Sequence, residues 1–269
     1  MSTANKLFQA ASGGASDPVY VEDVFSTYLY TGTGSGIAIN NGIDLAGEGG
    51  LVIYRRRDGA ENWSYQDTVR GVDSVIYSDS TNAAADPGGY GLASFNSNGF
   101  TTELNTSSAE YCSWTFRKQA GFFDIKTFTA ESDQFVTVNH DLGCNIGAVM
   151  FKETNGTGDW FFWHKSFSEN DIIRLNTTAA KQTGQGIISS QTSSSAKFYT
   201  DANTTSTYVA YFFGDGDDSN AQIFGDNSDE AIIKCGSYTG NGSTTGPEIN
   251  LGFEPQLLMI KASSGSTGS

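Results

Sequence analysis

The stretch "GLVIYRRRDGAENW" at residues 50–63 has a close counterpart in "GAVMFKETNGTGDW" at residues 147–160. Each stretch has a glycine, four apolar or aromatic residues, a cation, a polar turn that contains glycine, and a tryptophan. The paired glycines and tryptophans lie 97 residues apart, and "YCSWTF" at 111–116 returns as "YVAYFF" at 208–213 with the same spacing. A spacing that holds over this length indicates an internal repeat.

A third copy of the opening part of the repeat lies near the C-terminus. Arg55, Lys152 and Lys261 each follow a four-residue apolar run, the third of which lies at 257–260, and after Lys261 the chain consists of Ala, Ser, Gly and Thr. The sequence therefore predicts five segments: an N-terminal arm at 1–24, a first repeat at 25–121, a second repeat at 122–214, an acidic connector at 215–235, and the opening hairpin of an incomplete third repeat at 236–269.

The composition favours an all-β fold. Short β-branched and aromatic runs lie between clusters of Gly, Asn, Ser and Thr, with 32 glycines and only 4 prolines in 269 residues. The uninterrupted apolar runs at 51–54 and 148–151 predict central strands. Because a lone sheet cannot bury a face, each repeat must close as a sandwich of two sheets. We expect tandem β-sandwich repeats of the jelly-roll-like kind, preceded by an extended N-terminal arm.

Charge and cysteine usage exclude several classes of protein. A formal net charge of −15 argues against a nucleic-acid partner and against adhesion to an anionic membrane. The N-terminus lacks the apolar core of a signal peptide, and no apolar run is long enough to span a membrane. Cys112, Cys144 and Cys235 are too few and too scattered for a disulfide framework and predict reduced thiols. We expect a soluble protein made inside a cell.

Few residues suggest catalysis or metal binding. Nucleophilic catalysis usually needs a histidine beside the nucleophile, and the only histidines, His140 and His164, are more typical of structural roles. We therefore predict no catalytic residue, no enzyme activity and no cofactor. One loop has oxygen ligands at a spacing that suits Ca²⁺, which makes it a weak calcium candidate, but a solvated acidic connector is the preferred interpretation and we predict no metal; its residues are Asp215, Asp217, Asp218 and Asn220.

Three tryptophans are candidates for binding glycans or another subunit. Trp63, Trp160 and Trp163 follow central strands, where they either stack on sugars or pack in the core. In "DWFFWHKSF" at 159–167, alternation puts Trp160 and Phe162 on one face and the neighbouring aromatic residues on the other. Both faces are then apolar, and a face left uncovered within its repeat predicts an interface, most simply with a second subunit.

Several stretches resemble the repeats of structural proteins from tailed phages of marine bacteria, especially cyanophages. These stretches are "FFDIKTFT" at 122–129, "GAVMFKETNGTGDWFFWHKS" at 147–166, "TYVAYFF" at 207–213 and "CGSYTGNGSTTGPEINLGFEPQLLMIK" at 235–261. The resemblance covers nearly everything after residue 19, with one departure at 127–135, "TFTAESDQF", where that family more often has a Tyr-Thr-Gly turn. It implies a virion component and brings no catalytic residues with it.

Together these observations predict a non-enzymatic virion structural protein, most simply a tail fibre or spike that contributes to host attachment. Phe8 and Tyr20 in the arm would anchor the chain to the particle. The expected partners are other virion proteins and copies of the chain, with a homotrimer favoured, and the expected location is the virion, assembled in the host cytoplasm. One alternative is a capsid-decorating or head-fibre protein. A second is a carbohydrate-binding β-sandwich module that recognises a host surface glycan.

Overall fold

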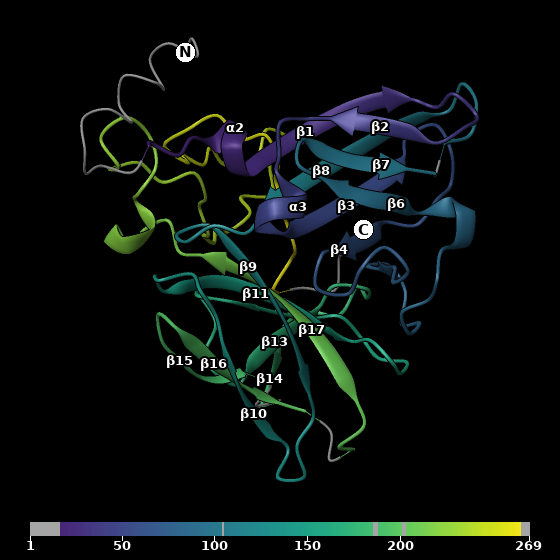
Figure 1. The fold of residues 1–269 in the computed structure, drawn as a ribbon. Coiled ribbons are helices and arrows are strands. Elements are labelled where there is room, and N and C mark those ends of the chain that lie inside the picture. The colour runs from purple at the N-terminus through teal and green to yellow at the C-terminus, as the bar shows by residue number, and fades with distance from the viewer. Residues whose placement is uncertain (1–16, 104, 185–187, 201–202, 265–269) are drawn as a thin grey trace.

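The chain folds into two units of antiparallel sheets stacked on one another (Figure 1). A computed structural model describes residues 17–103, 105–184, 188–200 and 203–264. Each unit has one large sheet and one three-stranded sheet, so the all-β sandwich-like architecture predicted from composition is confirmed.

The strands of the first unit form a five-stranded and a three-stranded sheet. The large sheet has the order β1 (Phe25–Thr31), β8 (Glu110–Arg117), β3 (Gly50–Arg56), β4 (Ser64–Asp67) and β5 (Ile76–Tyr77). The small sheet has the order β2 (Ile37–Asn40), β7 (Gly99–Thr102) and β6 (Leu92–Asn96).

The second unit repeats this arrangement with one added edge strand. Its large sheet has the order β9 (Phe123–Thr129), β17 (Thr207–Gly214), β11 (Ile146–Glu153), β12 (Phe161–His164), β13 (Asp171–Arg174) and β14 (Gln182–Thr183). Its small sheet has the order β10 (Phe135–Asn139), β16 (Ser195–Tyr199) and β15 (Ile188–Gln191).

In both units the last strand lies between the first strand and the central strand. β8 pairs with β1 on one side and with β3 on the other, and β17 pairs with β9 and β11 in the same way. The first and central strands therefore never pair with each other. We call β8 and β17 the closing strands, because the large sheet is continuous only when they are in place.

The recurring glycine before each central strand follows from the approach of the closing strand. A Cβ on Gly50 would lie 2.1 Å from the carbonyl oxygen of Phe116 on β8. A Cβ on Gly147 would lie 2.6 Å from the carbonyl oxygen of Gly214 on β17. These separations are far below van der Waals contact, so each position needs a residue without a side chain.

Each central strand is buried on both faces, which explains its uninterrupted apolar sequence. On β3, Val52 and Tyr54 pack against the small sheet of the first unit, whereas Leu51 and Ile53 face the second unit. On β11, Val149 and Phe151 join the core under the small sheet of the second unit, while Ala148 and Met150 face the first unit. Strand alternation thus distributes one apolar run over two cores.

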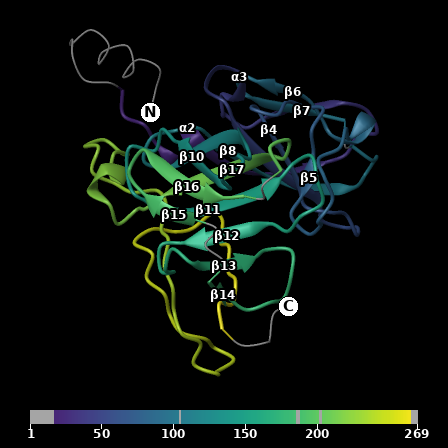
Figure 2. The same ribbon diagram turned by 90° about the horizontal axis from the view of Figure 1, so that it is seen from below.

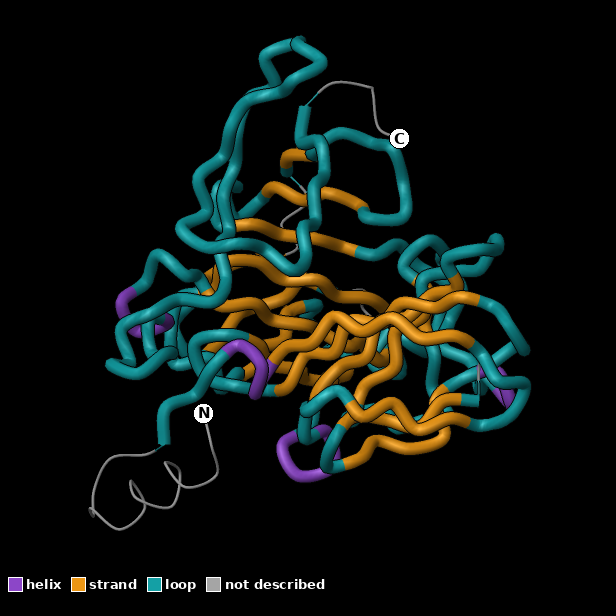
Figure 3. Tube along the Cα trace, turned by 90° about the horizontal axis from the view of Figure 1, so that it is seen from above, coloured by secondary structure: helices purple, strands orange, loops and turns teal. Residues whose placement is uncertain are grey.

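The molecule consequently has four layers in the order small sheet, large sheet, large sheet, small sheet. The middle core contains buried residues of both units, among them Leu51, Phe116, Met150 and Tyr211. We call this middle core the inter-unit core. Figure 3 shows the strands of the two units stacked beside one another, with the C-terminal part of the chain drawn as loop.

The residues before β1 do not form a free arm where they are described. Val24 at the end of α2 (Val21–Val24) is fully buried in the inter-unit core, and Val19 accepts a hydrogen bond of 3.0 Å from the amide of Gly225. The arm predicted at 1–24 is therefore wrong for residues 19–24, because these apolar side chains have a core to enter. The predicted anchor Phe8 lies outside the described residues. Tyr20 donates its hydroxyl hydrogen bond to Asp226 of the same chain.

The predicted hairpin at 236–269 is also wrong within the described part of that range, 236–264, which contains no strand. The strand order of the two complete units supplies the physical reason. The third-copy segments that correspond to the first and central strands would each pair with a closing strand, not with each other. None of the described closing strands is free, since β8 and β17 are already paired on both sides.

The short helices lie at the ends of the units and on the connector. α3 (Leu45–Glu48) precedes β3 and buries Leu45 under the first small sheet, with Asp44 accepting a hydrogen bond from the amide of Gly47. η1 (Gly88–Tyr90) precedes β6, and η2 (Ser219–Ala221) lies in the acidic connector. The connector also places Phe224 in the inter-unit core, so it is packed against the units and not simply solvated.

Candidate functional site

Residues 233–264, here called the C-terminal segment, run along the edges of both large sheets. Near β1, the hydroxyl of Thr27 donates a hydrogen bond of 3.4 Å to the carbonyl oxygen of Gln256. Beside β14, the amide of Lys181 donates a bond of 3.0 Å to the carbonyl oxygen of Ser263. Figure 2 shows this yellow stretch passing the region of β12, β13 and β14. Ile233, Cys235 and Leu257 pack against the inter-unit core, and the rest of the segment is held to the surface by isolated contacts.

The apolar run of the C-terminal segment is exposed. Leu258, Met259 and Ile260 have 60, 50 and 67% of their surface accessible to solvent. The corresponding residues of the two complete copies, at 51–54 and 148–151, are all buried. Contiguous exposed apolar side chains mark interaction surfaces. The apolar run is therefore buried in the core in the two complete copies and exposed at the surface in the third.

The backbone of this run is unpaired as well. Within the described chain, no amide of residues 256–261 donates a hydrogen bond to another protein group. Leu257 alone among the four apolar residues is half-buried, against the inter-unit core. The run thus presents both free backbone groups and apolar side chains, which are the two features that a pairing strand requires.

Two of the candidate calcium ligands, Asp215 and Asp217, are paired with lysine side chains. Lys165 lies 2.5 Å from a carboxylate oxygen of Asp215 and 2.5 Å from one of Asp217, and Lys234 also pairs with Asp217. The hydrogen bonds from these two ammonium groups lower the pKa of Asp217 to about 2. The charge that was expected to attract Ca²⁺ is therefore already compensated.

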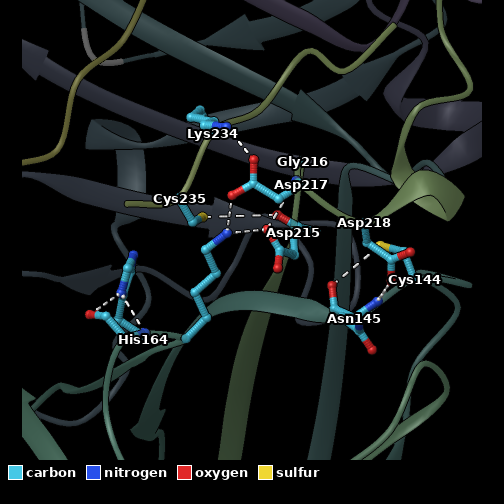
Figure 4. Close-up of polar contacts among 12 residues, drawn as sticks. Cys144, Asn145, His164, Asp215, Gly216, Asp217, Asp218, Lys234 and Cys235 are labelled. Carbon is cyan, nitrogen blue, oxygen red and sulfur yellow. Dashed lines mark hydrogen bonds and ion pairs between the residues drawn. The ribbon is translucent and has the colours of Figure 1, made fainter. Parts of the chain in front are cut away.

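The remaining predicted ligands point elsewhere. Asp218 accepts a hydrogen bond of 2.7 Å from the amide of Asn145 and others from the amide and side chain of Asn220. Figure 4 shows Asp218 beside Asn145 and Cys144, turned away from Asp217 and Lys234. No group of three or more His, Cys, Asp or Glu suited to a metal occurs among the described residues. The four candidate calcium ligands therefore do not converge on one point, because spacing along a loop does not fix where its carboxylates point.

Two of the three candidate tryptophans are core residues. Trp160 is fully buried in the inter-unit core and donates its indole N–H to the carbonyl oxygen of Tyr77 in the first unit at 2.8 Å. Trp163 is buried in the core of the second unit and donates to the carbonyl oxygen of Ser168 at 3.2 Å. Neither indole face can stack on a sugar, so the glycan role is wrong for both residues.

The predicted alternation around Trp160 is confirmed, but its partner is different. Trp160 and Phe162 face the first unit, whereas Phe161 and Trp163 face the second small sheet. The face that we assigned to a second subunit is covered by the other repeat of the same chain. Trp63, the third candidate, is half-buried, with its ring 5.0 Å from that of Trp114.

The histidines have structural surroundings. His140 is buried, accepts a hydrogen bond of 3.3 Å from the amide of Leu142, and lies 5.0 Å from the ring of Phe212. His164 shares a 2.8 Å hydrogen bond with the hydroxyl of Ser166. Burial lowers the pKa of both imidazoles. Both are therefore neutral near pH 7.

The cysteines are free thiols in the described structure. Burial raises the pKa of Cys144 to about 11 and that of Cys235 to about 12. A protonated thiol is a poor nucleophile and a poor metal ligand. Both side chains lie close to the backbone of Gly214 at the end of β17, where they fill space between the second unit and the connector.

Buried polar contacts join the two units, and the sequence pattern did not predict them. Asp67 is fully buried and receives the guanidinium of Arg70 at 2.6 Å and the hydroxyl of Tyr211 at 2.7 Å. Fully buried Lys152 donates to the carbonyl oxygens of Thr81 at 3.1 Å and Gly158 at 2.8 Å. These groups join the first unit to the second. The cation that recurs near the end of each central strand, Arg55 and Lys152, was the one available signal, and it indicated the start of a turn.

A depression of about 280 Å³ lies where the two units meet. Buried Asp124 lies at its wall, 3.3 Å from Lys118 and 3.2 Å from Lys126. Its carboxylate also accepts hydrogen bonds of 2.8 Å from the amides of Ile125 and Asp141. All of these partners belong to the junction itself, so the depression is a polar seam between the units.

Among the described helices, none has the length and apolar character needed to cross a membrane. No curated protein and no solved structure significantly matches the chain. Residues 21–268 match a family described as a domain of unknown function, DUF7483. This match includes both units, the connector and the C-terminal segment as one family domain. The chain therefore belongs to the DUF7483 family.

Proposed function

We propose that this chain is a non-enzymatic structural component of a phage particle, namely a tail fibre or spike that contributes to host attachment and acts as a homotrimer. The observation that carries the proposal is the exposed part of the apolar run, at 258–260, in a copy of the repeat whose counterparts are buried. An assembly protein needs such a surface, because its partners complete what its own fold leaves open.

Two further features support a structural role. The two complete repeats share the inter-unit core and the buried Asp67–Arg70–Tyr211 network, so they form one stiff body. The sequence resemblance to repeat proteins of marine tailed phages concerns the same stretches that build these strands. A stiff tandem of repeats suits a shaft that holds a host-binding end away from the particle.

Labelling of purified particles tests this proposal. An antibody raised against the purified chain is applied to density-purified phage from the source culture, and bound gold is located by electron microscopy. We expect label on tail fibres. Label on the head would replace the fibre with a capsid-decorating protein. Particles without label, confirmed by mass spectrometry of their proteins, would overturn the virion role.

Native mass tests the trimer separately. Light scattering of the chain, at 28.7 kDa per copy, should give about three times that mass if the proposed trimer forms. A monomer at all concentrations would contradict the trimer.

A further inference from the structure

We infer that the C-terminal segment provides both rims of a strand-insertion site, between which a single β-strand of another polypeptide inserts. This inference rests on the proposed function, because it names the kind of partner that the exposed run takes. The observation behind it is the position of the closing strand in both complete units.

The two rims of the site follow from the repeat. Residues 233–239 correspond to β1 and β9, since Tyr238-Thr239 aligns with Tyr30-Thr31 and Phe128-Thr129. Residues 257–261 correspond to the central strands, since Lys261 aligns with Arg55 and Lys152. In both complete units one closing strand lies between these two elements and pairs with both. The third copy therefore needs one strand, antiparallel to both rims.

The chemistry of the partner strand is specified by the closing strands. β17 places Tyr208, Ala210 and Phe212 in one core and Val209, Tyr211 and Phe213 in the other. An inserted strand with apolar side chains on both faces would cover Leu258 and Ile260 on one face and Leu257 and Met259 on the other. The partner is thus an extended segment of about seven residues with aromatic or aliphatic side chains on both faces.

One residue limits the register. Gln256 occupies the position of Gly50 and Gly147, where the closing strand leaves no room for a side chain. The inserted strand must therefore pair from Leu257 onward and end before Gln256. In the first unit this limit corresponds to the pairing of Leu51 with Phe116 on β8. A probe strand should accordingly stop at the equivalent of Phe116.

The probe is a fluorescein-labelled peptide with the sequence of residues 205–213, which carries the apolar side chains of β17 on both faces and ends at Phe213, the counterpart of Phe116. Fluorescence polarisation measures its binding to the full chain. We expect saturable binding, and binding weaker by about tenfold or more for a peptide of the same composition with its alternation permuted. Hydrogen exchange should slow by about tenfold or more at alternate amides within 257–261, because only the amides that face the inserted strand gain partners.

Variants identify the surface. The double substitution Leu258→Asp with Ile260→Asp should abolish peptide binding, whereas Tyr90→Asp, at a still more exposed aromatic residue on the first unit, should leave it unchanged. All of these side chains are exposed, so the variants should retain the thermal stability of the parent chain. Unaltered binding by the double variant would overturn the inference.

Two other results would also overturn it. The peptide could fail to bind, or it could bind without slowing exchange at 257–261. If the chain instead self-associates and the double variant abolishes that association, the occupant is a second copy and not a foreign strand. None of these results depends on particle labelling, so a failure here leaves the virion proposal standing, and absence from particles leaves strand insertion standing.

Discussion

The hydroxyl of Tyr211 in the second unit donates a 2.7 Å hydrogen bond to the buried carboxylate of Asp67 in the first. The same hydroxyl accepts a 3.1 Å bond from Arg70, which also pairs with Asp67. The three groups satisfy one another within an otherwise aromatic core. Because such a network fails when any member is removed, it fixes how the two repeats face each other.

Arg70→Ala should destabilise the chain by about 3–5 kcal/mol, because it leaves the carboxylate of Asp67 buried without its cation. Tyr211→Phe should cost about 1–3 kcal/mol, the usual cost of one buried polar group left without a partner. Urea denaturation measures both. Arg56→Ala is the matched control, since its pair with Asp58 lies at the surface, where solvent screens it, and should contribute little to stability. Equal losses for Arg70→Ala and Arg56→Ala would contradict the network.

Trp160→Ala should lower the free energy of unfolding by about 3–5 kcal/mol, because it opens a cavity between the units. Trp160→Phe should lower the free energy of unfolding by less, because it removes chiefly the hydrogen bond to Tyr77. Trp63→Ala, at a half-buried indole outside the deepest part of the core, is the control and should cost less than Trp160→Ala. Thermal and urea unfolding measure the loss of stability in each variant. If Trp160→Ala costs no more than Trp63→Ala, Trp160 is not a buried core residue.

Stability should fall as the pH drops below about 6.5. Burial lowers the pKa of His140 from its ordinary value of 6.5, an effect that Asp124 and Asp141 offset only in part. Below pH 6.5 the unfolded chain therefore binds a proton that the folded chain does not. The loss is at most about 1.4 kcal/mol per pH unit for one histidine.

His140→Gln should reduce this slope between pH 6.5 and 5. Urea denaturation at a series of pH values measures it. His164 has a lowered pKa for the same main reason and should account for part of the remaining slope. An unchanged slope in the His140→Gln variant would show that His140 titrates alike in both states.

Calcium should not stabilise the wild-type chain. The carboxylates of Asp215 and Asp217 are paired with lysines, so added Ca²⁺ or a chelator should leave the melting temperature within about 1 °C. Lys165→Met removes the shared cation and is the informative variant, since it leaves Asp215 without a cation and Asp217 with Lys234 alone, and it should destabilise the connector. A calcium-dependent rise in the melting temperature of the wild type would show that the ion displaces these lysines.

Much of the fold followed from local pattern. The 97-residue spacing, the strand-like runs and the glycines at 50 and 147 all reflect constraints on short stretches, namely side-chain alternation and close backbone approach. The alternation around Trp160 was predictable for the same reason. The pairing of Asp67 with Arg70 and Tyr211 was not, because the last two groups are 141 positions apart along the chain and meet only when the repeats stack.

The C-terminal segment shows the limit most clearly. Its residues have the pattern of a first strand and a central strand, and pattern alone predicted a hairpin. Both strands need a third strand between them, and the described chain has none to spare. A strand sequence becomes a strand only when its hydrogen-bonding groups find a partner.

The sequence by itself determined that the chain is an all-β repeat and which residues are apolar on each face of its central strands. Only the tertiary structure decided what covers those faces: the other repeat for Trp160 and Met150, and solvent for Leu258 and Ile260. The physical reason is that the hydrophobic effect rewards the removal of apolar surface from water without regard to direction or partner. The partner is selected by strand order, and strand order belongs to the folded chain as a whole.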